Sequence, residues 1–302
     1  MRQYVIKDLE RLSGVKAGTI RIWEQRYGLL SPVRSDTNIR YYHDSDLKKL
    51  LNVSMLLDKG IRISKISTLN GAELKEEITK YIEEGESISE QTDFYIQALV
   101  VAMLEVDEAR FNNLFARAVN EKGFLNAITE YIYPFLVKVG MMWGMDEVNP
   151  GQEHFISCLI RQKLIAGINE LPIQADSKNG HKYVLFCSQG ELHEIGLILA
   201  NYILRSHGYQ VIYLGQDVPL RDIEQVVEEA NPSHLLSIFT AARTPEEYEK
   251  MLKEYDAAFK HTKLVYSGLN YYLDKINWQP PSNVLVIQGA DDFIKHLNKV
   301  PV

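Results

Sequence analysis

A polar loop in the second half of the chain combines a carboxylate, an imidazole and a glycine. Glu191, His193 and Gly196 lie between an apolar run at 183–187 and an amphipathic stretch at 195–207. An imidazole nitrogen can ligate a metal, and a neighbouring carboxylate can hold the other ring nitrogen and raise the basicity of the ligand. A lone histidine in such a loop is also common as a helix cap or a solvated side chain. The spacing alone therefore leaves both interpretations open.

The segment that contains this loop alternates short apolar runs with helical stretches. Strands are expected at 183–187, 211–215, 235–239, 264–266 and 284–287, separated by helical or loop segments. Such alternation is typical of a doubly wound, Rossmann-like α/β domain with a parallel sheet. Ligands of these sheets bind at the carboxyl ends of the strands, which is where the loop lies.

The preceding segment, from 73 to 173, has helical spacing of its apolar residues and predicts a four-helix bundle. Trp143 lies near its end, and Glu153 and His154 follow ten and eleven positions later. Taken alone, these residues also fit a core tryptophan and a polar pair at the start of a helix.

Charge is distributed unevenly along the 302 residues, whose net charge is −7. Residues 1–65 carry 13 Lys and Arg against 7 Asp and Glu, a local charge of +6, while the other 237 residues carry −13. A basic module on an acidic body is expected when one domain meets phosphates and another does not. Apolar runs stay short of a membrane span, and the first residues are charged where a signal peptide is apolar, so we expect a cytoplasmic protein.

The basic module has the spacing of two short helices with a tight turn between them. A helix over 4–12 is stopped at Ser13-Gly14, and a second over 16–27 ends at Gly28. An Asp/Thr/Asn turn near residue 36 then predicts a two-stranded wing, and a third helix is expected at 46–58.

This module resembles the MerR family of winged-helix transcription factors. The resemblance rests on the stretches GVKAGTIRIWEQRYGLLSPVR and NIRYYHDSDLKKL. It implies that the second helix enters the major groove of DNA and that the wing contacts phosphates, roles that suit guanidinium and phenol groups. Alternatively, single arginines could pair with Glu24, Asp36 or Asp44 at the surface. The DNA-contacting residues that the resemblance assigns are Arg21, Arg26, Tyr27, Arg34, Arg40 and Tyr41.

The acidic-x-His-x-x-Gly loop resembles the cobalamin-binding domains of methionine synthase, corrinoid shuttle proteins and some MerR-type regulators. This resemblance implies that His193 is the lower cobalt ligand, that Glu191 holds its ring and that Gly196 lets the nucleotide tail approach. It also assigns two further residues to cofactor binding, Ser237 after the third strand and Gly268 after the fourth strand. The related domains have two glycines at the latter position, where this chain has one.

The helical segment resembles that of the CarH/LitR-type photoreceptors, which are light-sensing repressors that use adenosylcobalamin. The resemblance implies that Trp143, Glu153 and His154 cap the adenosyl group. Gly144 replaces a histidine that ligates cobalt after illumination in some relatives, so we do not expect a bis-histidine photoproduct.

Together these features predict three domains: a DNA-binding domain at 1–72, a helical cap at 73–173 and a cobalamin-binding domain at 178–302. The expected function is that of a DNA-binding transcriptional regulator, not an enzyme, that senses adenosylcobalamin and light. Its expected partners are operator DNA, cobalamin and further copies of itself in a dimer or tetramer, with RNA polymerase left open. Two alternatives are a corrinoid carrier for methyl transfer and a MerR-type regulator that has lost corrinoid binding.

Overall fold

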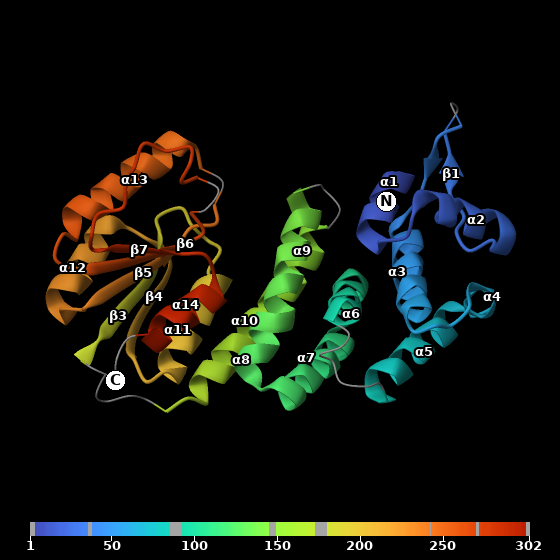
Figure 1. Cartoon of the computed structure of the whole chain (residues 1–302), viewed down its shortest axis with the longest axis horizontal. Helices are drawn as coiled ribbons and strands as arrows, with labels where there is room; N and C mark the ends of the chain where they lie inside the picture. The colour runs from blue at the N-terminus through green and yellow to red at the C-terminus, as the bar shows by residue number, and fades with distance from the viewer. Residues whose placement is uncertain are drawn as a thin grey trace. The chain divides into compact units, whose positions relative to one another are not determined.

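The computed structural model describes residues 4–35, 38–84, 92–144, 149–172, 180–241, 243–269 and 272–299. The chain divides into two compact units, Met1–Ile156 and Ser157–Val302, and each is described by itself. Figure 1 shows a helical first unit and a second unit built around a sheet.

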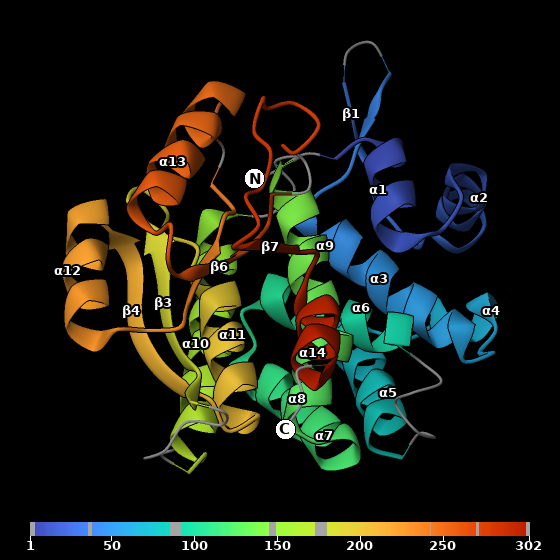
Figure 2. The ribbon, with the colours of Figure 1, turned by 60° about the vertical axis from the view of Figure 1, so that its left-hand side comes forward.

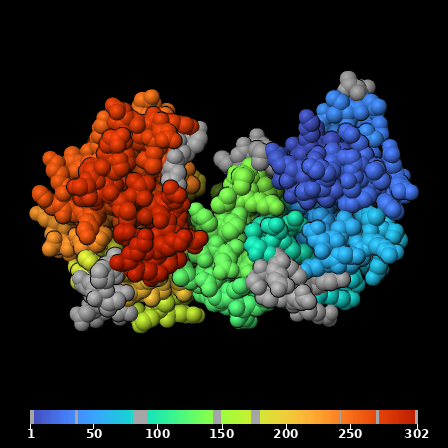
Figure 3. All heavy atoms as spheres, viewed as in Figure 1, coloured from blue at the N-terminus to red at the C-terminus, as the bar shows by residue number. Residues whose placement is uncertain are grey.

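The first unit begins with the expected helix-turn-helix and wing. Gly14 and Gly28 end the first two helices in left-handed backbone conformations, φ +74° and +59°. The wing strands are antiparallel and rise from the blue N-terminal module (Figures 1 and 3). The elements are α1 Ile6–Ser13, α2 Ala17–Tyr27, β1 Val33–Arg34, β2 Arg40–Tyr41, α3 Asp44–Asp58, α4 Ile63–Ile66 and α5 Gly71–Glu84.

The rest of the first unit is helical. A π-helical turn at Ile128–Ile132 lies just before Pro134, whose missing N–H interrupts the ordinary helical hydrogen-bond ladder. The helices are α6 Thr92–Glu105, α7 Glu108–Lys122, α8 Phe124–Ala127, α9 Tyr133–Gly144 and α10 Pro150–Asn169, the last of which continues into the second unit.

Helix α6 explains why the helix-turn-helix with its wing and the following helices form one unit. Nine of its side chains, among them Leu99 and Met103, are buried, as expected for a helix that is apolar on all sides. It packs against α3 on one side and against α7 and α9 on others. Ser54 of α3 also donates a hydrogen bond to Gln97 of α6, at 3.2 Å.

The second unit is the predicted doubly wound α/β domain. Its five parallel strands have the order β4-β3-β5-β6-β7. Helices α12 and α13 cover one face of the sheet, and α11 and α14 cover the other (Figure 2). The elements are β3 Lys182–Ser188, α11 Ile195–Ser206, β4 Gln210–Val218, α12 Leu220–Ala230, β5 His234–Ile238, α13 Pro245–Ala258, β6 Lys263–Ser267, β7 Val284–Ile287 and α14 Ala290–Lys299.

The strand order places a topological switch point between β3 and β5. The connections from these two strands leave toward opposite faces of the sheet, and ligands of open α/β sheets bind at the carboxyl ends of strands at such a point. The loop with Glu191 and His193 follows β3 at this edge.

Gly268 follows β6 at the same edge and packs directly against the chain after β5. Its φ is +87°, and a Cβ at this position would lie 2.0 Å from the carbonyl oxygen of Phe239. A side chain is therefore excluded both by the backbone conformation and by the backbone that it would meet.

We expect Gly268→Ala to lower the free energy of unfolding of the second unit by about 4 kcal/mol or more, because strain and a backbone clash add. Gly215→Ala is the matched control, since Gly215 has φ +86° but its Cβ would make only ordinary contacts with side chains, those of Tyr213 at 3.6 Å and Glu194 at 3.8 Å. That control should lose about 1–3 kcal/mol. Urea unfolding followed by circular dichroism measures both, and equal losses would show that the close approach to Phe239 carries no cost.

Candidate functional site

The loop after β3 is organised by the buried carboxylate of Glu191, which is 1% exposed. One oxygen accepts hydrogen bonds from the backbone N–H groups of Thr240, at 2.7 Å, and Ala241, which follow β5. The other accepts from the backbone N–H of His193 at 3.0 Å and lies 2.7 Å from its ring atom Nδ1. Glu191 thus joins the ends of two neighbouring strands and fixes the imidazole.

Hydrogen bonding decides the charge of this carboxylate. Burial alone would raise the pKa of Glu191, but the N–H donors of His193, Thr240 and Ala241 and the His193 ring together lower it below its ordinary value. An ionised carboxylate at Nδ1 requires a proton on that nitrogen. The neutral ring of His193 therefore carries its lone pair on Nε2.

This arrangement leaves Nε2 of His193 as the ring atom that can ligate a metal from solvent. The side chain of His193 is 67% exposed, and its Nδ1 is held by Glu191. Within the part of the chain that the structure describes, no group of three or more His, Cys, Asp or Glu side chains could hold a metal ion. A metal bound at His193 must therefore bring most of its ligands with it.

The surroundings of the loop are closely packed. A Cβ on Gly196, in the first turn of α11, would lie 3.2 Å from the Cδ1 atom of Ile238. Ser237, on β5, is fully buried, and its hydroxyl has no hydrogen-bond partner among the described residues. Glu194 anchors the start of α11 by accepting a hydrogen bond from Tyr213 at 2.9 Å and pairing with Arg161 of α10 at 3.2 Å. Sequence reasoning missed these anchors because they come from distant segments.

Glu153 and His154 lie in the first turn of α10, within the first unit. His154 is 78% exposed, and its Nδ1 lies 3.1 Å from a carboxylate oxygen of Glu153. The side chain of Trp143 lies outside the described part of the structure, and Gly144 is the last residue of α9. Because the units are not placed relative to each other, the structure does not bring these residues together with His193.

The winged module presents most of its predicted arginines to solvent. Arg21 and Arg26 are exposed on α2, and Arg34 on β1 hydrogen-bonds Asn38 at 2.6 Å. Tyr27 and Tyr41 are half-buried. Sequence reasoning missed the exposed apolar side chains beside them, which are Ile22, Val33 and Ile39.

Arg40 behaves differently, because it pairs with Glu24, the alternative that the sequence left open. Its Nε lies 3.0 Å from a Glu24 oxygen, and the two side chains are 23% and 12% exposed. Tyr42 donates a hydrogen bond to the other oxygen at 3.1 Å, and its burial, followed by the charge of Glu24, raises the pKa of Tyr42 to about 12. Arg40 therefore ties the wing to α2.

Comparison with known proteins agrees with this geometry. The family described as MerR HTH family regulatory protein matches residues 4–71, and the B12 binding domain family matches residues 95–166. The HTH-type transcriptional repressor CarH of Myxococcus xanthus is 30% identical over 256 residues, which cover 83% of each chain. The chain belongs to this family of MerR-type regulators with a B12-binding domain. The repressor CarA of the same organism is 27% identical over 266 residues, 87% of this chain and 86% of CarA.

The fold of this MerR-type regulator also resembles a solved structure, the monomethylamine corrinoid protein of Methanosarcina barkeri. The TM-score is 0.55 with 16% identity, and the match covers 71% of this chain and all of that chain. Among the described residues, no helix is long and apolar enough to cross a membrane.

The different environments of Arg21 and Arg40 generate a prediction for DNA binding. We expect Arg21→Ala to lower by about one the number of counterions released on binding a mixed-sequence duplex, which is read from the slope of log affinity against log salt concentration. The free energy of unfolding should stay within about 0.5 kcal/mol of the wild type. Arg40→Ala should instead cost about 1–2 kcal/mol of stability, because Glu24 keeps its burial and loses its cation. It should also weaken binding to all sequences, because the wing loses its tie to α2.

Fluorescence anisotropy across a range of NaCl concentrations measures the first effect, and thermal unfolding measures the second. Arg117→Ala, on α7, is the control for the loss of an arginine outside the winged module. The assignment would be wrong if Arg21→Ala destabilised the protein while Arg40→Ala did not.

Proposed function

We propose that the protein is a transcriptional regulator that binds adenosylcobalamin through His193 and couples the state of the cofactor, under light, to oligomerisation and operator binding. The observation that carries this proposal is the exposed imidazole whose Nδ1 is held 2.7 Å from a buried carboxylate. We retain the division into a DNA-binding domain (1–72), a helical cap (73–173) and a cobalamin-binding domain (178–302).

The residues at the carboxyl edge of the sheet fit a corrinoid. A corrinoid would bring most of the ligands of its cobalt with it, and His193 would hold the group through Nε2, the ring nitrogen that Glu191 does not contact. The buried hydroxyl of Ser237 lacks a partner among the described residues. Gly196 and Gly268 let the start of α11 and the chain after β6 pack directly against Ile238 and the backbone of Phe239, which holds this edge of the sheet together.

Each group of residues has a separate task in this proposal. Glu191 orients the His193 ring and, when that ring is neutral, holds its proton on Nδ1, while Ser237 and the two glycines lie where the nucleotide tail would bind. When bound, adenosylcobalamin supplies a cobalt–carbon bond that light cleaves. Trp143, Glu153 and His154 contact the adenosyl group and therefore stabilise only the state that retains it.

Differential contact of this kind is what a sensor requires, because a ligand shifts a conformational equilibrium only by its difference in affinity for the two states. The DNA-binding module disfavours the alternative of a methyl carrier, which has no use for DNA. The alternative of a regulator that has lost corrinoid binding is decided by the following experiment.

We expect the full chain mixed with adenosylcobalamin to show the absorbance change of histidine replacing the cofactor's own base. His193→Ala should abolish this change and weaken binding by about tenfold or more, since even an outer partner of a metal ligand is worth that much. His261→Ala, an exposed histidine of the same unit, should behave as the wild type. A spectrum unaltered in His193→Ala would refute the ligand assignment.

We expect green light to change both the assembly state and operator binding of the adenosylcobalamin-loaded protein, because the cap residues lose their partner. Size-exclusion chromatography and gel shift before and after illumination measure the two effects. Trp143→Ala should reduce the difference between dark and light, and protein loaded with hydroxocobalamin, which has no adenosyl group, is the control. If light alters neither property, a light-independent cobalamin sensor becomes the better account.

A further inference from the structure

A second cavity lies at the amino-terminal edge of the sheet, opposite the edge that carries the His193 loop. It has a volume of about 510 Å³ and is formed by the beginnings of β3, β5, β6 and β7 together with α14. This size is within the range of pockets that hold small organic ligands. Strand β3 begins at this cavity and ends at the His193 loop, so the two places are separated by the length of the strand.

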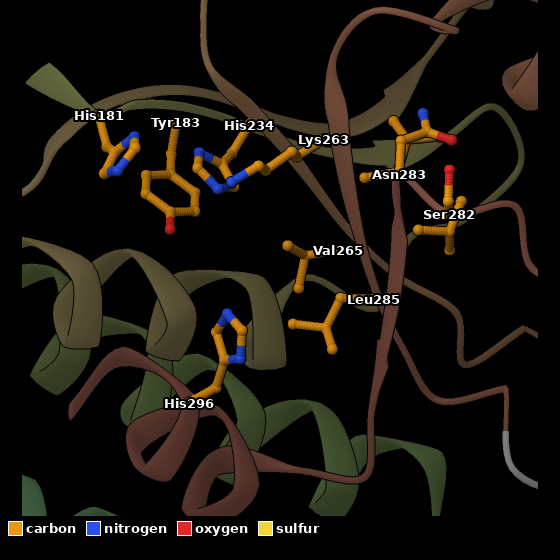
Figure 4. A pocket seen from close by; sticks show the side chains of 11 residues that line it. His181, Tyr183, His234, Lys263, Val265, Ser282, Asn283, Leu285 and His296 are labelled. Carbon is orange, nitrogen blue, oxygen red and sulfur yellow. The ribbon is translucent and has the colours of Figure 1, made fainter. Parts of the chain in front are cut away.

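The polar lining of the cavity combines basic groups with the neutral side chains of Tyr183, Ser282 and Asn283. It includes the imidazoles of His181, His234 and His296 and the amine of Lys263. Among the described residues that line it, none is acidic. Figure 4 shows the amine of Lys263 beside the ring of His234, and the ring of His296 directed from α14 toward the same space.

His181 and His234 are held in place by ring packing. His234 stacks on Tyr183 with ring centres 4.4 Å apart and an interplanar angle of 16°. The ring of His181 meets that of His234 edge-on at 5.0 Å. The Nδ1 of His234 lies 2.8 Å from the hydroxyl of Ser233, which leaves its Nε2 for another partner. The imidazole array is therefore preorganised.

Burial and neighbouring basic groups both favour the neutral form of His234. Burial, followed by the charges of His181, Lys263 and His296, lowers the pKa of His234 to about 3. A bound anion would supply the negative charge that the lining lacks. A metal ion would add positive charge instead. Among the described residues, moreover, no group of three His, Cys, Asp or Glu side chains could hold one.

We propose that this cavity binds a small organic anion, with its phosphate or carboxylate group held by Lys263 and His296 beside the ring of His234. The apolar part of the ligand lies against Val265 and Leu285, which are among the apolar residues of the lining (Figure 4). Inorganic phosphate alone leaves these two side chains uncovered, so the organic anion binds more tightly.

Isothermal titration calorimetry of the full chain tests the proposal, with phenyl phosphate and benzoate as the two anionic probes and benzyl alcohol as the neutral one. We expect millimolar or tighter binding of at least one anion and none of the alcohol. Lys263→Gln and His296→Gln should each weaken binding by about tenfold, the loss expected for a charge-assisted hydrogen bond. The phosphate and carboxylate probes distinguish the two classes of ligand.

The chain offers matched controls close to the same edge. Lys260→Gln and His261→Gln remove an exposed lysine and an exposed histidine that do not line the cavity, and they should change affinity less than twofold. No binding of either anion at millimolar concentration, or equal losses in the control variants, would overturn the proposal.

A final comparison separates this cavity from the proposed cofactor site. Protein loaded with cobalamin should bind the anion as the free protein does, and Lys263→Gln should retain the cobalamin absorbance spectrum. If loading with cobalamin abolished binding of the anion, the cavity would belong to the cofactor, and the inference of an independent ligand would be refuted. The measurement on free protein stands whether or not His193 ligates cobalt.

Discussion

The candidate cofactor site depends on the hydrogen bonds that the buried carboxylate of Glu191 accepts. A buried carboxylate is costly unless donors surround it, and here three backbone N–H groups and one imidazole do so. Two of these donors, Thr240 and Ala241, follow β5, while His193 belongs to the loop after β3. The position of the exposed imidazole is therefore set by the pairing of two parallel strands and does not depend on the loop alone.

Glu24 has a comparable role in the DNA-binding module. Its two oxygens hold Arg40 and Tyr42, which lie at the end of the wing, and so join the wing to α2. In both units a buried or half-buried carboxylate joins segments that carry functional side chains. Loss of either carboxylate would leave donors and cations without partners, which costs more than its own hydrogen bonds contribute.

Sequence periodicity predicted the helix-turn-helix, the wing and the α/β alternation, because each depends on local spacing and on stops such as Gly14 and Gly28. The pairing of Glu191 with His193 is also local and was predicted. The contact of Glu191 with Thr240 spans 49 positions and follows from strand order, which spacing does not encode. For the same reason the cavity near Lys263 was not foreseen, since its lining comes from the starts of separate strands.

Helix α10 bears on how the proposed coupling could work. It carries Glu153 and His154 in its first turn, in the first unit, and Arg161 further along, in the second. Arg161 pairs with Glu194, the residue that follows His193 and precedes α11. Coupling between two sites requires an element whose equilibrium both sites bias. Helix α10 carries Glu153 and His154 in its first turn and an ion pair to Glu194 further along, so it is the candidate for that element.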